Sequence, residues 1–215
     1  ENCSAIGAGG NGEGIVTING GVVTAVATTT GTAIGGGIGF NSNGGKGIVT
    51  ISGGTVYAYN HANRWKIPSS AIGGGGSKKM AGATGIVTIT NGTVYAQSVL
   101  GTAIGGGSSY WSYGGAAEIT ITGGKITAKS LPSEPEKDDF GAGIGGGTGC
   151  SSKEVGEAGT TQWNGGNATV RISGDPIIRT GSIGGGKTGS ASSYLGHADI
   201  TVSGGDIQAQ FIMEA

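Results

Sequence analysis

Hydrophobic and polar residues alternate in a short stretch that recurs six times along the chain. In order, the stretches read GIVTINGG, GIVTISGG, GIVTITNG, EITITGG, ATVRISG and DITVSGG. Apolar residues two positions apart are typical of β-strands, and β-branched residues suit a pleated, half-buried surface. We therefore expect one strand per repeat here, with two inward columns: Val16, Val49, Val87, Ile119, Val170 and Ile200, and then Ile18, Ile51, Ile89, Ile121, Ile172 and Val202.

Two further strands are predicted in each repeat. After a glycine turn comes a second alternating stretch, whose expected inward residues are Val23, Val56, Val94, Ile126, Ile177 and Ile207. A Gly-rich segment, usually A-I-G-G-G, opens each repeat with the isoleucines Ile6, Ile34, Ile72, Ile104, Ile144 and Ile183. These isoleucines are separated by 28, 38, 32, 40 and 39 residues, which indicates a fixed coil that carries insertions of variable length.

Three short strands cannot bury a core alone, but coils stacked in register bury a continuous ladder of Ile, Val and Ala. The pattern therefore predicts an all-β fold, a right-handed parallel β-helix of about six coils with three short strands per coil. We expect residues 1–215 to form a single β-helix repeat domain, a fragment of a larger protein. Six coils at a spacing of ~4.8 Å give a stack of about 29 Å. A β-propeller is the alternative, but its blades need four antiparallel strands and usually a longer repeat.

Glycine accounts for 51 of the 215 residues, without the three-residue period of collagen and with only 4 prolines. The regular Ile and Val positions also argue against disorder. We interpret each glycine triad as a sharp corner, where a side chain would clash with the next coil or where the backbone needs a positive φ. The alternative is a bare strip of backbone that a flat ligand could approach.

Charge, the length of the apolar runs and the context of one motif argue against three partners: nucleic acid, membrane and nucleotide. The net charge is −1 and the Lys and Arg residues are scattered, so no basic stripe predicts nucleic-acid binding. The apolar runs are strand-length, so we expect no membrane insertion. Residues 181–188 read GSIGGGKT and match the Walker A pattern, but that motif needs a strand leading into a helix that faces phosphate. Because sister repeats read GTAIGGGIG and GTAIGGGSS, we expect no nucleotide.

Aromatic residues in the insertions after the glycine triads are the candidate ligand-binding residues: Tyr110, Trp111, Tyr113, Trp163 and Tyr194. Insertions of stacked repeats lie on one edge, which is commonly the binding edge. Aromatic rings offer flat apolar faces to the C–H surface of sugars, which predicts a polysaccharide or host glycan as partner. Alternatively, these rings fold back over the core. A second, lesser cluster comprises Tyr57, Tyr59, His61 and Trp65.

Hydroxyls dominate the outward positions of the first alternating stretch: Thr17, Thr50, Thr88, Thr120, Arg171 and Thr201. Since a lyase or glycosidase needs paired carboxylates, or calcium with a basic residue, we name no catalytic residue and keep such an enzyme as a third hypothesis. The column also resembles the hydroxyl ladders of β-helical antifreeze proteins, although Arg171 interrupts it. No cofactor is expected, but calcium is an alternative at the acidic segment Glu134, Glu136, Asp138 and Asp139.

The recurring A-I-G-G-G … G-x-I-T-I-x-G-G-x-V-x-A pattern resembles the Gly-rich parallel β-helix repeats of large secreted proteins of anaerobic Gram-positive bacteria. More loosely, it is similar to β-helical carbohydrate-binding proteins of cellulolytic clostridia. This resemblance implies a secreted or cell-surface location and a stalk, adhesion or glycan-binding role. The leading hypothesis is a non-catalytic, monomeric module that binds glycan along the loop edge near Trp111 and Trp163, and the competing hypothesis is a passive spacer.

Overall fold

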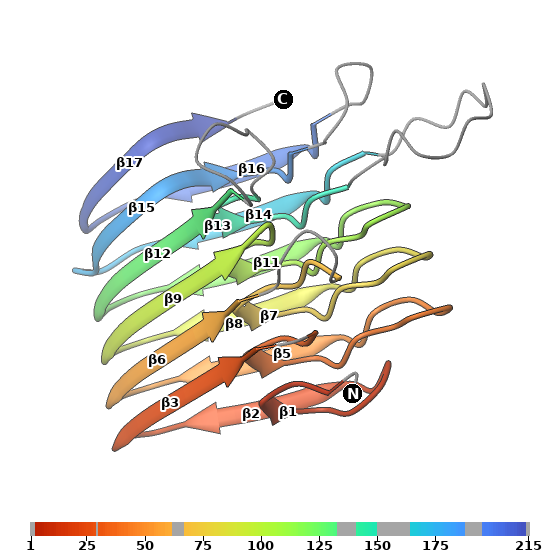
Figure 1. Cartoon of the computed structure of the whole chain (residues 1–215). Coiled ribbons are helices and arrows are strands. Elements are labelled where there is room, and N and C mark those ends of the chain that lie inside the picture. The colour runs from red at the N-terminus through yellow and green to blue at the C-terminus, as the bar shows by residue number, and fades with distance from the viewer. Residues whose placement is uncertain are drawn as a thin grey trace.

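The chain winds into a parallel β-helix in which every strand pair is parallel (Figure 1). The structure, a computed structural model, describes residues 3–28, 30–61, 67–132, 141–149, 164–187 and 195–213, and only the backbone of 211–213. Within these ranges all regular elements are β-strands. The predicted all-β parallel β-helix is confirmed.

Three stacks of strands make up the walls of the helix. The short strands are β1 (Ile6–Gly7), β4 (Ile34–Gly35), β7 (Ile72–Gly73), β10 (Ile104–Gly105) and β13 (Ile144–Gly145). The middle strands form one six-stranded sheet: β2 (Gly14–Ile18), β5 (Gly47–Ile51), β8 (Gly85–Ile89), β11 (Ala117–Ile121), β14 (Ala168–Ile172) and β16 (Ala198–Val202). The long strands are β3 (Val22–Ala27), β6 (Thr55–Asn60), β9 (Thr93–Val99), β12 (Lys125–Leu131), β15 (Ile177–Gly184) and β17 (Asp206–Met213).

Equivalent residues of successive coils lie directly beside one another. The six isoleucines of the Gly-rich motif pair in sequence order, from Ile6 with Ile34 to Ile144 with Ile183. Both predicted inward columns of the middle strands also stack in register, and their central members are buried. Exposure rises only at the two edge strands, as at Val202, which is 50% exposed.

One predicted core residue is wrong by a single position. In the fifth coil Ile178, not Ile177, pairs with Ile126 and is buried, whereas Ile177 pairs with Lys125 and is 39% exposed. The cause is the turn before it, where Ser173, Gly174, Asp175 and Pro176 replace the three-residue turn of the fourth coil. Because side chains alternate between the two faces of a strand, one extra turn residue moves the other isoleucine inward.

The end of β17 adds one more strand to the stack of short strands. Its last residues run beside the end of β15, so that Ile212 pairs with Ile183 and Met213 with Gly184. The isoleucine of a seventh Gly-rich position is therefore present, although its motif lacks the glycine triad and the sequence pattern did not reveal it.

Both reasons proposed for glycine at the corners, a positive φ and a clash with the next coil, are confirmed. The first glycine of each triad has a positive φ, 140° at Gly105, and a Cβ built there would collide with the carbonyl oxygen of Gly145 in the next coil. A second positive-φ position follows each middle strand, for example Gly124 at 90°. Non-glycine residues adopt such backbone conformations only at a cost.

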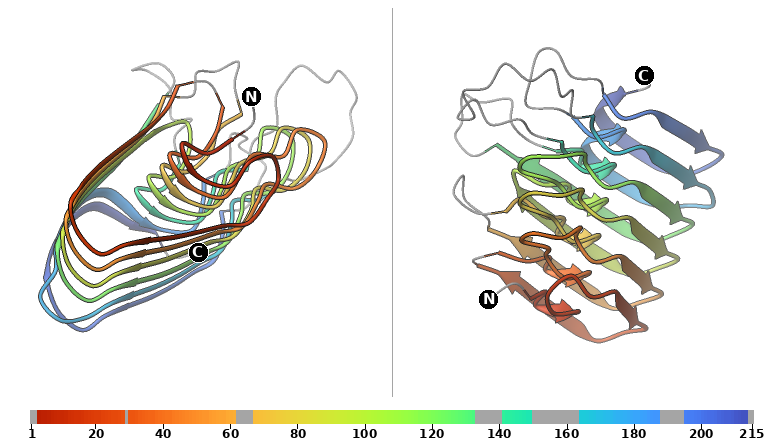
Figure 2. Two further views of the ribbon diagram at one scale, coloured as in Figure 1. Left: turned by 90° about the horizontal axis from the view of Figure 1, so that it is seen from below. Right: turned by 90° about the vertical axis from the view of Figure 1, so that its right-hand side faces the viewer.

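Beyond the triads, the chain leaves the β-helix and returns, and the two limbs pack through their backbones. Ten backbone N–H···O bonds of 2.7–3.1 Å connect the limbs of successive coils into one ladder, which joins Gly12, Gly37, Gly45, Gly75, Ala83, Gly107, Gly115, Gly147, Gly166, Gly186 and Gly196. We call this arrangement the glycine layer. Figure 2 shows its loops nested at one side of the stack.

The glycine layer is closed to ligands over most of its length. Residues 35–37, 73–75, 105–107, 145–147 and 184–186 are all buried. In these five coils the interpretation of the triads as a bare binding strip is therefore wrong. Within the stretch that matches the Walker A pattern, Gly184 ends β15 and Gly186 belongs to the glycine layer.

Candidate functional site

The outer face of the long strands carries a continuous series of half-buried and exposed side chains that could contact a ligand. Register defines one outward column over six coils: Thr24, Tyr57, Tyr95, Thr127, Arg179 and Gln208. Two residues further along the strands lie Val26, Tyr59, Gln97 and Lys129. The column therefore changes from aromatic to polar and cationic toward the C-terminal coils.

A groove opens on this face where two neighbouring strands separate. β12 pairs with β15 only as far as Ala128 and Thr180. After that point β12 continues along β9 to Leu131, whereas β15 turns inward to pair with β13 through Ile183. Residues 129–143 separate Ala128 from Ile144, but only Gly181 and Ser182 separate Thr180 from Ile183. The fifth coil thus takes a shorter path than the fourth, which leaves a ledge between them.

We call the hollow at this ledge the step groove. It has a volume of about 470 Å³, within the range of ligand sites in proteins. It is lined by Thr127, Lys129, Ser130, Leu131, Arg179, Thr180, Gly181, Gln208, Ala209 and Gln210. A Cβ built on Gly181 would meet nothing within 4 Å, so the missing side chain at this position is part of the hollow.

A smaller hollow of about 100 Å³ shares Thr127 and Lys129 with the step groove and extends it to Tyr95. The Tyr95 ring stacks on Tyr57 with centroids 5.1 Å apart and planes 6° apart, and Tyr57 in turn stacks on Tyr59. Since the next coil presents Thr127 beside Tyr95, the tyrosine stack ends there. The face of Tyr95 opposite Tyr57 therefore borders the smaller hollow.

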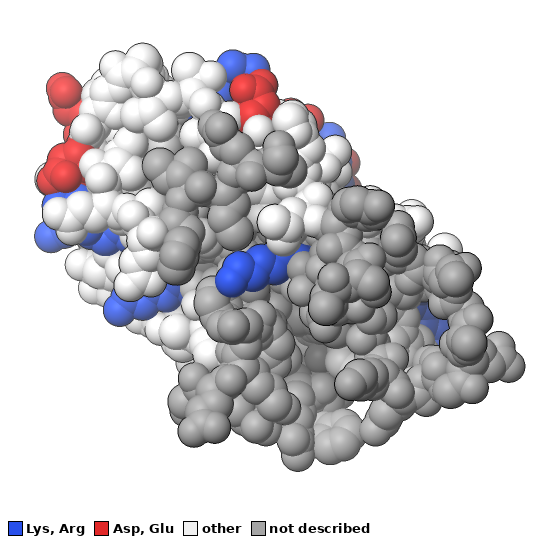
Figure 3. Space-filling view, turned by 90° about the horizontal axis from the view of Figure 1, so that it is seen from above, with Lys and Arg blue, Asp and Glu red and all other residues white. Residues whose placement is uncertain are grey.

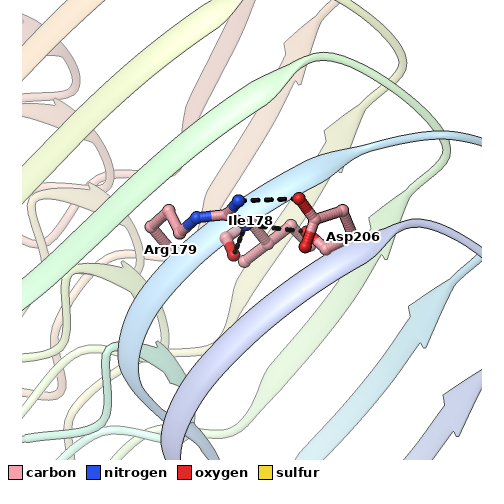
Figure 4. Close-up of polar contacts among 3 residues, drawn as sticks. All are labelled: Ile178, Arg179 and Asp206. Atoms are coloured by element: carbon pink, nitrogen blue, oxygen red, sulfur yellow. Dashed lines mark hydrogen bonds and ion pairs between the residues drawn. The ribbon is translucent and has the colours of Figure 1, made fainter.

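An ion pair fixes the guanidinium of Arg179, which lines the step groove (Figure 4). Arg179 Nη2 lies 2.7 Å from Asp206 Oδ2, while Nη1 donates to the carbonyl oxygens of Asp206 and Ile178 at 3.1 and 3.0 Å. The hydrogen bond from Arg179 lowers the pKa of the Asp206 carboxyl. Three hydrogen bonds thus hold the guanidinium in one orientation on the groove wall.

Tyr110, Trp111 and Tyr113 lie at the loop tip of the fourth coil. The Tyr110 and Trp111 rings meet edge to face at 5.8 Å, and Lys78 Nζ lies 5.6 Å from the Trp111 centroid. The same ammonium lies 4.7 Å from the Phe40 ring, so a cation–π chain joins three neighbouring loop tips. Tyr113 is 47% exposed. The predicted sugar-binding edge stays a prediction, with one Trp111 face already facing Lys78.

Several other predicted site residues lie outside the described residues: Trp65, Glu134, Glu136, Asp138, Asp139, Trp163 and Tyr194. In the part of the chain that the structure describes, no group of three or more His, Cys, Asp or Glu is placed to hold a metal ion.

Charges are sparse on the described surface seen in Figure 3, where blue and red atoms lie side by side at its left border.

The hydroxyl column of the middle sheet stacks as predicted through Thr17, Thr50, Thr88 and Thr120, and Arg171 interrupts it. A hollow of about 280 Å³ beside Arg171 is lined by Glu118, Ile119, Thr120, Thr169 and Arg171. A regular flat array of hydroxyls thus ends at the fourth coil, which does not favour ice binding.

The sequence pattern predicted a site among the inserted residues and did not predict the step groove. The available signal was the opposite, a missing insertion between Thr180 and Ile183, combined with outward Lys129, Arg179 and Gln208 on the second alternating stretch. Reading this signal requires knowing that a shortened coil pulls β15 away from β12.

The fold and the groove define a parallel β-helix repeat protein with a polar hollow on its long-strand face. Residues 49–76, 87–108 and 119–148 match a family model described as a beta helix repeat. Each matched stretch begins at the inward Val or Ile of a middle strand and continues through the next glycine triad, as the coil does. Comparison with curated proteins and with solved structures finds no match. Among the described residues, none forms a helix with the length and apolar character needed to cross a bilayer.

Proposed function

We propose that this chain is a non-catalytic, secreted or cell-surface module that binds polysaccharide in the step groove and its extension to Tyr95. The observation that carries the proposal is the step groove itself, because it combines hydroxyl, amide and cationic side chains on one open face. Sugars present many hydroxyls and apolar C–H faces, which such side chains and an aromatic ring can satisfy together.

The dimensions favour a chain-like ligand. Tyr95, Thr127, Arg179 and Gln208 occupy four successive coils, which places the first and last about 14 Å apart at the ~4.8 Å strand spacing. The hollow runs along the stack across strand ends rather than into the core, where the inward Ile126 and Ile178 fill the space. A short stretch of a linear glycan fits this open track better than a compact small molecule.

The residues around the groove favour binding over catalysis. Glycoside cleavage commonly needs two carboxyl groups that flank the scissile bond. Among the described residues that line the two hollows there is no carboxylate. The nearby Asp206 is paired with Arg179, whose hydrogen bond favours its ionised form. The resemblance to secreted Gly-rich repeat proteins supports a role in adhesion.

The test is a glycan array probed with the wild type, Gly181→Leu and Gly20→Leu. Gly181→Leu fills the step groove without strain, because its Cβ has open space and its φ is not positive. Gly20 has the same two properties on the turn after β2, outside the groove, and is the matched control. We expect Gly181→Leu to lose binding and Gly20→Leu to retain it.

A third variant, Trp111→Ala, separates the two candidate surfaces. Loss of binding in Trp111→Ala with full binding in Gly181→Leu would move the site to the loop tips and overturn the groove assignment. No glycan bound by the wild type would favour the passive spacer, and turnover of a polysaccharide would favour the enzyme.

A further inference from the structure

The step groove is cationic as well as polar. Of the side chains that line it and the smaller hollow, Lys129 and Arg179 carry positive charge, and none of the described ones carries negative charge. The carboxylate of Asp206, paired with Arg179, lies outside both linings. The two cations come from adjacent coils, since Thr127 pairs with Arg179 and Lys129 follows Thr127 by two residues.

The two cations differ in how firmly their side chains are held before an anion binds. Arg179 is held in place by three hydrogen bonds, so little side-chain entropy is lost when it contacts a ligand. Lys129 is exposed and has no ion pair within the part of the chain that the structure describes. Its ammonium can therefore reach an anion beside Gly181, where no side chain stands between the two coils.

Resting on the proposed function, we infer that the glycan is anionic and that Lys129 and Arg179 bind its carboxylate or sulfate groups. Charge-assisted hydrogen bonds are shorter and stronger than neutral ones, so these contacts select the ligand among polysaccharides of similar shape. Thr127, Gln208 and Gln210 then bind neutral hydroxyls, and Tyr95 contacts a sugar face. Since the site is open to solvent, binding weakens as the salt concentration rises.

The experiment is calorimetric titration with paired ligands that share a backbone. Homogalacturonan oligomers are compared with their fully methyl-esterified, neutral form, and dextran sulfate is compared with dextran. We expect binding to at least one charged member and at least about tenfold weaker binding to its neutral partner, as loss of charged hydrogen bonds implies. Binding to the uronate alone or to the sulfate alone identifies which anion the site takes.

Two lysines of the same strand provide the matched variants. Lys129→Gln removes the groove cation and is expected to weaken binding about tenfold or more and to reduce its salt dependence. Lys125→Gln removes another exposed charge, one that lines neither hollow, and should leave affinity nearly unchanged. Neither side chain contributes to the core, so both variants are expected to fold.

The outcomes separate this inference from the proposed function. Equal binding of charged and neutral partners, unaffected by Lys129→Gln but lost in Gly181→Leu, would retain the glycan site and overturn its anionic ligand. Equal loss in Lys125→Gln and Lys129→Gln, or equally tight binding of single-stranded DNA, would indicate non-specific attraction of polyanions and overturn the inference. Failure of every glycan to bind would overturn both.

Discussion

Arg179 on β15 and Asp206 on β17 form an ion pair, Nη2 to Oδ2 at 2.7 Å, that joins the last two long strands. The pair is partly exposed, so its contribution to stability is modest and screened by salt. Because the pKa of Asp206 is lowered on folding, the contribution is complete above the ordinary value of 3.8 and disappears as the pH falls through the lowered pKa. We expect Asp206→Asn to lower the melting temperature slightly at neutral pH and not at all well below pH 3.8. An effect of Asp206→Asn that grows as the pH falls would contradict this sign.

The first glycine of the triad cannot be replaced. Gly105→Ala places a methyl group against the carbonyl oxygen of Gly145 at a φ of 140°, and this column is glycine in all six coils. We expect a loss of at least about 3 kcal/mol in the free energy of unfolding, measured with urea. Gly20→Ala, with open space around its Cβ, is the control and should change stability by less than about 0.5 kcal/mol. Comparable stability of the two variants would show that the corner can relax.

The buried amide of Asn60 fastens a loop of its own coil to that of the previous one. Its Nδ2 donates to the carbonyl oxygens of Gly31 at 2.9 Å and Ser69 at 3.0 Å, and the residue is 1% exposed. Asn60→Leu leaves these carbonyls without that donor in a buried site. We expect a loss of about 2 kcal/mol or more in chemical unfolding, compared with a few tenths for the exposed Asn19→Leu. Equal effects of the two substitutions would argue that water replaces the amide.

Tyrosines of one stack differ in their expected role in binding. Tyr95 borders the smaller hollow, whereas Tyr57 lies between the rings of Tyr95 and Tyr59 in the stack. Tyr95→Leu is therefore expected to weaken glycan binding about tenfold, as loss of an aromatic contact of 0.5–1.5 kcal/mol plus apolar area implies. Tyr57→Leu should weaken it at most twofold, because it acts only through its neighbour. The affinities are measured by titrating both variants with the same oligosaccharide. A larger loss of affinity in Tyr57→Leu than in Tyr95→Leu would place the sugar elsewhere on the sheet.

The inward columns of the core could be predicted because two periodicities agreed: alternation within each strand and glycine turns between them. Val49 and Val87 were identifiable on this basis without knowledge of the insertions. The prediction failed at Ile177, where two adjacent isoleucines follow Pro176 and either satisfies the alternation. Only the length of the turn decides between them, and turn length is not part of the repeat pattern.

The candidate site was less accessible to prediction for a different reason. Lys129 and Arg179 lie 50 positions apart in the sequence and become neighbours only through strand register. The hollow between them forms because β12 and β15 diverge. This divergence depends on the difference in length between two coils, and the sequence of neither coil alone indicates it. The glycine layer was likewise predicted as a corner, while its ladder from Gly12 to Gly196 depends on main-chain atoms that carry no residue-specific signal.

The short path from Thr180 to Ile183 has a consequence for how such stacks acquire new surfaces. Where a coil has a short turn, its strand lies closer to the axis than that of its longer neighbour, and described side chains of both coils line a recess. The short connection thus leaves a recess while the isoleucine columns on both sides stay in register. Any junction between a long and a short turn of a stacked solenoid is therefore a place where a ligand site can arise without a single added residue.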